Sequence, residues 1–301
     1  MNDNSDNFKT ATDISSQGFE YGVKHFYNPK SGIVTEILFN TLGLAEYEAT
    51  ALLNLGAVYV NNQRLMLNNH LAENQLFRVH TKPRRYGIDY QWLHLIVYEN
   101  SDFIVVNKPS GLPSHPSVDN AIENSLTQCS LALGTQLLIT HRLDTLTEGL
   151  IVYAKKSEFV KQFNWQLQNR LIEKFYCAVV ESKNPLPSKL IHYMEPSPRA
   201  PKKLSDSYQE NWALCELEII EQRALQSGRW LKINLITGRT HQIRAQLAHT
   251  QSPILGDTLY GSQSNYQTAR PSPGIALRAC EMRFNWGQQR LCFNLSEDFD
   301  L

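Results

Sequence analysis

Short runs rich in β-branched and aromatic residues dominate the chain beyond Leu95. They include "FIVVNK", "GLIVYAK", "EKFYCAVV" and "RWLKINLI", and runs of this length and composition are typical of β-strands. In the last run Leu231, Ile233 and Leu235 share one face and polar residues take the other, which is the alternation of a half-buried strand. Because helical segments intervene irregularly, we predict an α+β fold around a mixed, largely antiparallel β-sheet.

A smaller unit precedes these strands. In "GIVTEILFNTLG" the apolar residues have helical spacing and Gly43 ends the segment, and "AEYEATALLNLG" predicts a second helix that stops at Gly56. "AVYVNNQRL" reads as a strand that enters an Asn-Asn turn, with "LAENQLFRVHT" as its partner. We therefore predict a polar N-terminal extension (1–31), a small α/β domain (32–85) and, after the turn-rich "KPRRYGIDYQW", a large domain (90–301).

Within the large domain we expect four further elements. "LIVYENSDFIVVNKPSG" predicts a β-hairpin, and Ser157 with Glu158 predicts the cap of a helix. "THQIRAQLAH" predicts a helix that follows a turn, and "PILGDTLYG" predicts a loop.

Composition excludes several classes of protein. The polar start and the lack of any apolar run near ~20 residues argue against a signal peptide and a membrane span, so we expect a cytoplasmic protein. The five cysteines lie far apart without a C-x-x-C pair, which argues against disulfides and zinc. No G-x-G-x-x-G or P-loop occurs, so no nucleotide cofactor is expected.

Charge is balanced overall but uneven along the chain. Lys plus Arg and Asp plus Glu each number 29. Two basic stripes nevertheless occur: one between Arg223 and Arg244 without a carboxylate, and one in "SPRAPKKLS". Such stripes are candidates for contacts with nucleic-acid phosphates.

The segment "HRLDTLTEGL" places Asp144 in a polar turn between two apolar runs. A scaffold often presents a catalytic side chain from such a position. The structural alternative is that Asp144 only bonds its own backbone and that Arg142 is a solvated charge.

A second candidate is "TGRTHQIRAQLAH". Its Gly-Arg turn before a helix, with Arg239 and Arg244, suits phosphate or carboxylate, although an ordinary surface helix would look the same. His241 and His249 are eight positions apart, which is not the spacing of a helical metal pair. Tyr176, in the strand "KFYCAVV", is by position alone a core residue.

Together these segments resemble a known family. "HRLDTLTEGLIVYAKK" is similar to the signature H-R-L-D-x-x-T-S-G-L-L-L-x-A-K of the RluA-type pseudouridine synthases. "VVNKPSGLPSHP", "EKFYCAVV" and "LITGRTHQIRAQLAHTQSPILGDTLYG" resemble that family's other elements, in the same order, from about Leu95 to about Trp286. The N-terminal unit is similar to the small RNA-binding domain named after small-subunit ribosomal protein four.

Two positions depart from the family pattern. Glu148 stands where many members have serine, and Arg278 stands where the family usually has histidine.

The resemblance implies that this chain isomerises uridines in ribosomal or transfer RNA to pseudouridine, as a monomer and without a cofactor or metal. It implies Asp144 as the carboxylate that acts on the ribose, Arg244 as its charge partner, and Tyr176 as the ring that stacks on the target base and as a candidate base for the proton on ring carbon 5. Arg142 would occupy the space left by the extruded base. The implied substrate-binding residues are Arg142, His141, Arg239, His241, Leu277 and Lys108.

Two other functions stay open at this point. One is an RNA-binding or ribosome-assembly factor on the same fold that has lost turnover. The other is a glycosidic-bond hydrolase, for which Glu148, four residues after Asp144, would have to be the second carboxylate.

Overall fold

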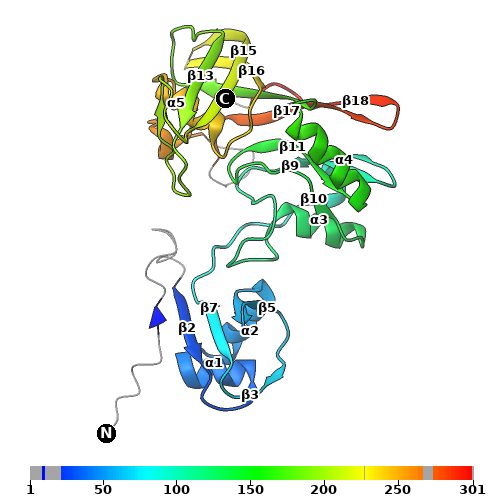
Figure 1. Ribbon diagram of the computed structural model, residues 1–301, viewed down its shortest axis with the longest axis vertical. Coiled ribbons are helices and arrows are strands. Elements are labelled where there is room, and N and C mark those ends of the chain that lie inside the picture. Colours follow the sequence, from blue (N-terminus) through cyan, green and yellow to red (C-terminus); the bar gives the residue numbers. More distant parts are fainter. Residues whose placement is uncertain (1–8, 11–21, 227, 267–273, 300–301) are drawn as a thin grey trace. The chain divides into compact units, whose positions relative to one another are not determined.

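The computed structural model describes residues 9–10, 22–226, 228–266 and 274–299. These form two compact units, drawn in Figure 1: one comprises the chain up to Ile88 together with His115–Gln128, and the other comprises Asp89–Ser114 and the chain from Cys129 onward. Most of the predicted 1–31 extension lies outside the described residues.

The small unit combines two helices with a five-stranded sheet in the order β1-β2-β7-β4-β5 and a two-stranded sheet, β3-β6, all antiparallel. Its elements are β1 (Lys9–Thr10), β2 (Val23–Tyr27), β3 (Gly32–Ile33), α1 (Val34–Leu42), α2 (Glu46–Leu55), β4 (Val58–Val60), β5 (Gln63–Leu65), β6 (His70–Leu71) and β7 (Leu76–His80).

The local signals of this unit are confirmed. Gly43 and Gly56 end α1 and α2 with φ of 69° and 68°, a left-handed conformation that glycine adopts without a Cβ clash. Asn61 and Asn62 also have positive φ and form the turn between β4 and β5. One core cluster joins both helices to the sheet, with Leu38, among others, fully buried.

The small unit is larger than the predicted 32–85 domain. It also includes β2 and the segment His115–Gln128, which the sequence placed in the large domain. This segment is held by ion pairs of Asp119 with Arg84 and of Glu123 with Arg85, both at 2.7 Å. Ion pairs between segments far apart in the sequence leave no local sequence pattern. The motifs therefore did not predict that this segment belongs to the small unit.

The large unit contains an eleven-stranded sheet with the main order β14-β13-β15-β16-β12-β17-β11-β9-β8; β10 pairs with β11 and β18 with β17. Its elements are η2 (Trp92–Leu95), β8 (Ile96–Glu99), β9 (Phe103–Lys108), β10 (Leu138–Ile139), β11 (Glu148–Ala154), α4 (Ser157–Gln168), β12 (Glu173–Val180), β13 (Lys189–Met194), β14 (Leu204–Ser205), β15 (Ala213–Leu225), β16 (Gly228–Leu235), α5 (Gln242–His249), η3 (Thr258–Tyr260), β17 (Leu277–Trp286) and β18 (Gln289–Asn294). Helix α3 (Ser125–Leu133) crosses the boundary between the two units.

The predicted α+β fold with a mixed, largely antiparallel sheet is therefore confirmed, and the hairpin of β8 and β9, strands β11, β12 and β16, and helices α4 and α5 lie where the patterns placed them. One detail is wrong: the capping position of α4 is Lys156, and the Ser157 hydroxyl bonds the Glu158 carboxylate instead of capping the helix.

Helix α4 packs on the sheet through aromatic rings. Phe159 stacks on Phe103 of β9 with the ring centroids 4.4 Å apart, and Phe163 meets Phe284 of β17 edge-on at 5.2 Å. These rings lie in a cluster of buried residues that joins α4 to β9, β11 and β17. The packing holds β11 and β17 in one core.

Strands β11 and β17 form the one parallel pairing among the described strands of the large sheet, and it is short: Glu148 lies opposite Arg278 and Gly149 opposite Ala279. Gly149 has φ of 108°, and a Cβ there would lie 2.3 Å from the Ala279 carbonyl oxygen. We call this pairing the seam. Only glycine allows the two backbones to approach so closely.

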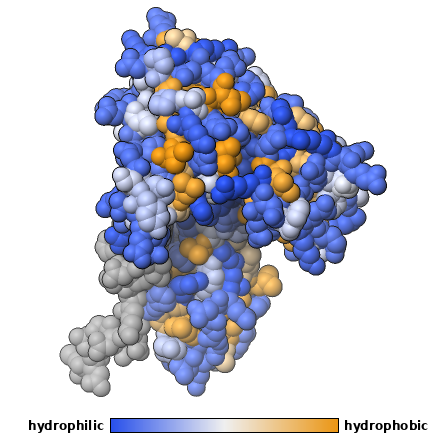
Figure 2. All heavy atoms as spheres, turned by 45° about the horizontal axis from the view of Figure 1, so that its top comes forward, coloured by the Kyte–Doolittle hydropathy of each residue, from blue (hydrophilic) through white to orange (hydrophobic). Residues whose placement is uncertain are grey.

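On the face shown in Figure 2, hydrophobic residues form small separate groups among hydrophilic ones. None of the helices in the described part of the chain is long and apolar enough to cross a membrane.

The seam makes a stability prediction. Gly149→Ala should lower the free energy of unfolding by roughly 2–5 kcal/mol, from the positive φ and from overpacking against the Ala279 backbone. Gly134→Ala is the control, because Gly134 has φ of 60° but open space around its Cβ position, and should cost only about 1–2 kcal/mol. Urea unfolding of both variants measures the difference; equal losses would contradict the close approach.

Candidate active site

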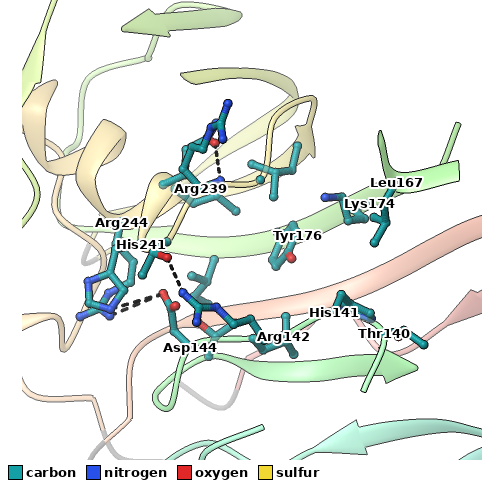
Figure 3. Close-up of a pocket in the computed structure, with 18 residues that line it drawn as sticks. Thr140, His141, Arg142, Asp144, Leu167, Lys174, Tyr176, Arg239, His241 and Arg244 are labelled. Atoms are coloured by element: carbon teal, nitrogen blue, oxygen red, sulfur yellow. Dashed lines mark hydrogen bonds and ion pairs between the residues drawn. The ribbon is translucent and has the colours of Figure 1, made fainter. Parts of the chain in front are cut away.

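A cavity of about 410 Å³ opens in the large unit. It is enclosed by the loop before β11, strand β12, the turn before α5 and the start of β17. Figure 3 shows the side chains that line it. The volume suits a ligand of nucleoside size.

Asp144 lies at one side of the cavity. Its carboxylate oxygen Oδ2 is 3.7 Å from Nη1 of Arg244 and 3.8 Å from Nε2 of His241. The loop that carries it is fixed at several points: the Thr147 amide donates to the Asp144 carbonyl, and the hydroxyls of Ser110 and Ser114 donate to carbonyls of the same loop. Asp144 is the single carboxylate among the described residues that line the cavity.

Arg244, on helix α5, is held by a second carboxylate. Its Nε and Nη2 donate to the two oxygens of Asp257 at 2.7 and 2.8 Å, and both side chains are almost completely buried. A bidentate pair of this kind fixes the plane of the guanidinium group. Asp257 therefore aims the remaining Nη1 of Arg244 at Asp144.

His241 occupies the capping position of α5 with φ of 59° and ψ of 20°, a left-handed conformation that is uncommon for a residue with a side chain. Its Nδ1 lies 3.2 Å from the Tyr260 hydroxyl. Burial lowers the pKa of His241, while the charge of Asp144 raises it. The strained backbone turns the imidazole toward the carboxylate.

Tyr176 points into the cavity from β12, as labelled in Figure 3. Burial raises the pKa of its hydroxyl well above the ordinary value, and the charge of Asp144 raises it further. The phenol thus stays protonated at neutral pH.

The other residues implied by the resemblance line the cavity, with one exception. Nη2 of Arg142 donates to the Thr240 hydroxyl at 2.5 Å, Arg239 is exposed at the rim, and Leu277 lines the wall. His141 also lines the cavity.

His141 is held in its neutral form. Its Nε2 accepts a hydrogen bond from the Val152 amide at 3.1 Å, and its ring stacks on Phe163 with centroids 5.7 Å apart. Burial lowers its pKa to about 3, and the charge of Lys174 contributes.

Lys108 is the exception, and the expectation that it binds substrate is corrected. Its side chain is fully buried, and Nζ donates to the carbonyls of Pro109, Leu112 and Thr145. Burial lowers its pKa to about 7, whereas the charges of Asp144 and Glu148 raise it. The motif predicted Lys108 to lie near the site. Its hydrogen bonds to backbone carbonyls instead stabilise the loop that carries Asp144.

Three residues in or beside the cavity were not predicted. Asp257 and Tyr260 come from the "GDTLYG" motif, which was recognised without roles, and Lys174 lines the cavity two positions before Tyr176. Strand alternation could have indicated Lys174, because residues i and i+2 share a face.

Part of one basic stripe and two groups of potential metal ligands lie outside the site. Part of the stripe from Arg223 is engaged elsewhere: Arg229 is buried and donates to backbone carbonyls, and Lys232 pairs with Glu297. In the described part of the chain, the groups that could hold a metal ion are Cys177 with Cys280 and Glu297, and His192 with Asp206 and His249. Neither group includes a cavity-lining residue.

The chain is similar to proteins of one known family. Residues 102–249 match the family model described as RNA pseudouridylate synthase. An uncharacterized RNA pseudouridine synthase of Mycoplasma pneumoniae is 30% identical over 251 residues, which cover 77% of this chain and 78% of that relative. The chain belongs to the RNA pseudouridine synthase family. The resemblance of the motifs is thereby confirmed for the large unit.

Other members of the RNA pseudouridine synthase family differ in length. The chloroplastic RNA pseudouridine synthase 6 of Oryza sativa subsp. japonica is 31% identical over 231 residues, 68% of this chain, and the chain spans only 48% of that relative. The structure titled human RNA pseudouridylate synthase domain containing 4 has a TM-score of 0.54 at 22% identity, covering 68% of this chain and 89% of that one. This likeness supports the fold.

The neutral His141 predicts a pH dependence of stability. Its pKa is about 3 when folded, below its ordinary value of 6.5, so the unfolded chain binds one more proton between these values and stability falls as pH drops from about 6.5 toward 3. Between pH 6 and 4 the free energy of unfolding should fall more steeply for the wild type than for His141→Gln, by up to about 1.4 kcal/mol per pH unit. Urea titrations at several pH values measure this. Parallel curves would show that His141 is not buried as a neutral group.

Proposed function

We propose that this protein isomerises uridines in structured ribosomal or transfer RNA to pseudouridine. The observation that carries the proposal is the arrangement of Asp144: a single carboxylate lining a cavity of nucleoside size, facing a guanidinium group that Asp257 holds in place. The reaction breaks the bond between ribose and ring nitrogen 1 and rejoins the base through ring carbon 5. It needs one carboxylate that acts on the ribose.

Asp144 is proposed to be that carboxylate. Arg244 supplies an opposite charge 3.7 Å away, which offsets the cost of holding a carboxylate in a partly buried cavity. The second ion pair, with Asp257, keeps Arg244 from collapsing onto Asp144 and covering it. The carboxylate therefore stays open on the cavity side.

The target base must leave its stack to reach Asp144, at a cost of a few kcal/mol. Tyr176 offers an aromatic face inside the cavity for that base, and Arg142 at the opening has a guanidinium plane that can stack in its former place. Both roles are part of the proposal.

Cationic side chains near the opening suit the RNA backbone. Lys174 and Arg239 line the cavity, and the basic segment around Lys202 lies beside it, because the Lys202 amide donates to the Tyr260 hydroxyl. Contacts of this kind make binding weaken as salt rises.

We also propose that the small unit binds RNA. The basis is the sequence of its elements, in which two helices, each ended by glycine, are followed by a hairpin. We also propose that the protein acts as a monomer.

The alternatives are less well supported. Hydrolysis by two carboxylates would require Glu148 in the cavity, but its Oε1 pairs with Arg278 at 2.7 Å and it is not among the lining residues. A factor without turnover would not need Asp144, Tyr176 and Arg244 around one cavity, yet all three line it.

Asp144→Asn should abolish pseudouridine formation and leave RNA affinity within about twofold, because the amide keeps the shape but cannot act as a carboxylate. The assay incubates the protein with uridine-labelled ribosomal and transfer RNA and separates isomerised nucleoside, unchanged RNA and free uracil. Asp206→Asn is the control, since Asp206 is exposed and lies outside the cavity.

Retained turnover in Asp144→Asn would refute the assignment of Asp144. Free uracil from the wild type would indicate the hydrolase, and bound but unchanged RNA would indicate the factor without turnover.

A further inference from the structure

We propose that Glu148 and Arg278 are positioning residues that fix the seam between the two parts of the large sheet and thereby set the distance from Asp144 to Arg244 and Tyr176. The inference rests on the proposed function. It concerns two residues that touch neither the cavity nor the reacting atoms.

The seam divides the residues of the site between two sets of strands. Asp144 precedes β11, which continues through β9 to β8. Tyr176 on β12 and Leu277 on β17 lie on the other side, and helix α5 with Arg244 follows β16 of that same side. Movement of β11 along β17 would carry Asp144 away from its partners.

Few backbone contacts resist such movement. The pairing of β11 with β17 covers only two residue pairs, whereas β11 meets β9 over six and β12 meets β16 over six. The Glu148–Arg278 ion pair lies on the first of the two seam pairs. A side-chain ion pair therefore joins the two strands where their backbone pairing is shortest. We call this Glu148–Arg278 pair the lock.

Arg278 has the hydrogen bonds that a lock needs. Nε and Nη2 donate to Glu148 Oε1 at 2.8 and 2.7 Å, and Nη1 donates to the carbonyls of Ser296 and Asp298 at 2.9 and 2.7 Å. The guanidinium carbon also lies 5.0 Å from the centre of the Phe299 ring. One side chain thus ties the start of β11, strand β17 and the segment after β18.

The lock is partly shielded from water. The side chains of Glu148 and Arg278 are 16% and 20% exposed, so removal of one partner leaves the other charge unpaired in a confined place. These are also the two positions at which the sequence departs from the family pattern. The structure shows that the two departures contact each other.

The test is a double-mutant cycle with Glu148→Gln, Arg278→Gln and the double variant. Each single substitution should lower kcat by about tenfold to a hundredfold, as expected for a misplacement near 1 Å, and leave KM and RNA affinity within about twofold. The double variant should lose no more than the worse single variant, because the two residues act as one unit. Uridine-labelled ribosomal and transfer RNA serve as substrates.

Glu99→Gln is the matched control. Glu99, the last residue of β8, pairs at 2.5 Å with Lys155, which follows the last residue of β11. The control therefore removes the same kind of charge at the end of β11 opposite the seam. It should leave kcat unchanged.

Hydrogen exchange gives a readout that needs no turnover. Amides of residues 147–150 and 277–281 should exchange faster in Glu148→Gln than in the wild type. In Glu99→Gln the exchange rates of these amides should equal those of the wild type. If the wild type forms no pseudouridine, the proposed function fails and exchange alone decides the role of the pair. Full kcat in both single variants, additive losses in the double variant, or unchanged exchange at the seam would each overturn the inference.

Discussion

The parallel contact between β11 and β17 is the constraint on which the rest of the large unit depends. The described strands of this sheet pair antiparallel except here, where the pairing is parallel. The two backbones approach so closely that a Cβ on Gly149 would clash with Ala279. The aromatic rings under α4 hold both strands in one core. Everything that gives the cavity its chemistry lies on one side of this contact or the other.

Charge is distributed in the site so that one carboxylate remains open. Asp257 takes two of the donors of Arg244 in a buried bidentate pair, and only Nη1 is left for Asp144. Outside the cavity, Nε and Nη2 of Arg278 both contact one oxygen of Glu148, Oε1. Among the described residues that line the cavity, Asp144 is the single acidic group.

Local patterns predicted the elements well because they depend on near neighbours. Helices α1 and α2 end at the predicted glycines, and β16 buries the face formed by Leu231, Ile233 and Leu235. The extent of the small unit depends on ion pairs between segments far apart in the sequence, which neighbouring residues do not reveal. Lys108 belongs to a recognised motif, yet three carbonyls surround its ammonium group, and no motif encodes which side of a loop a buried side chain faces.

The sequence by itself determined the fold class, the family and the segments that contribute to the site, because strand alternation, glycine positions and ordered motifs are written in neighbouring residues. Only the tertiary structure decided which charges meet. In the structure Asp257 binds Arg244, and His115–Gln128 belongs to the small unit. Glu148 pairs with Arg278, 130 positions away in the sequence. Such contacts depend on how strands align in space, and that alignment follows from the packing of the whole core.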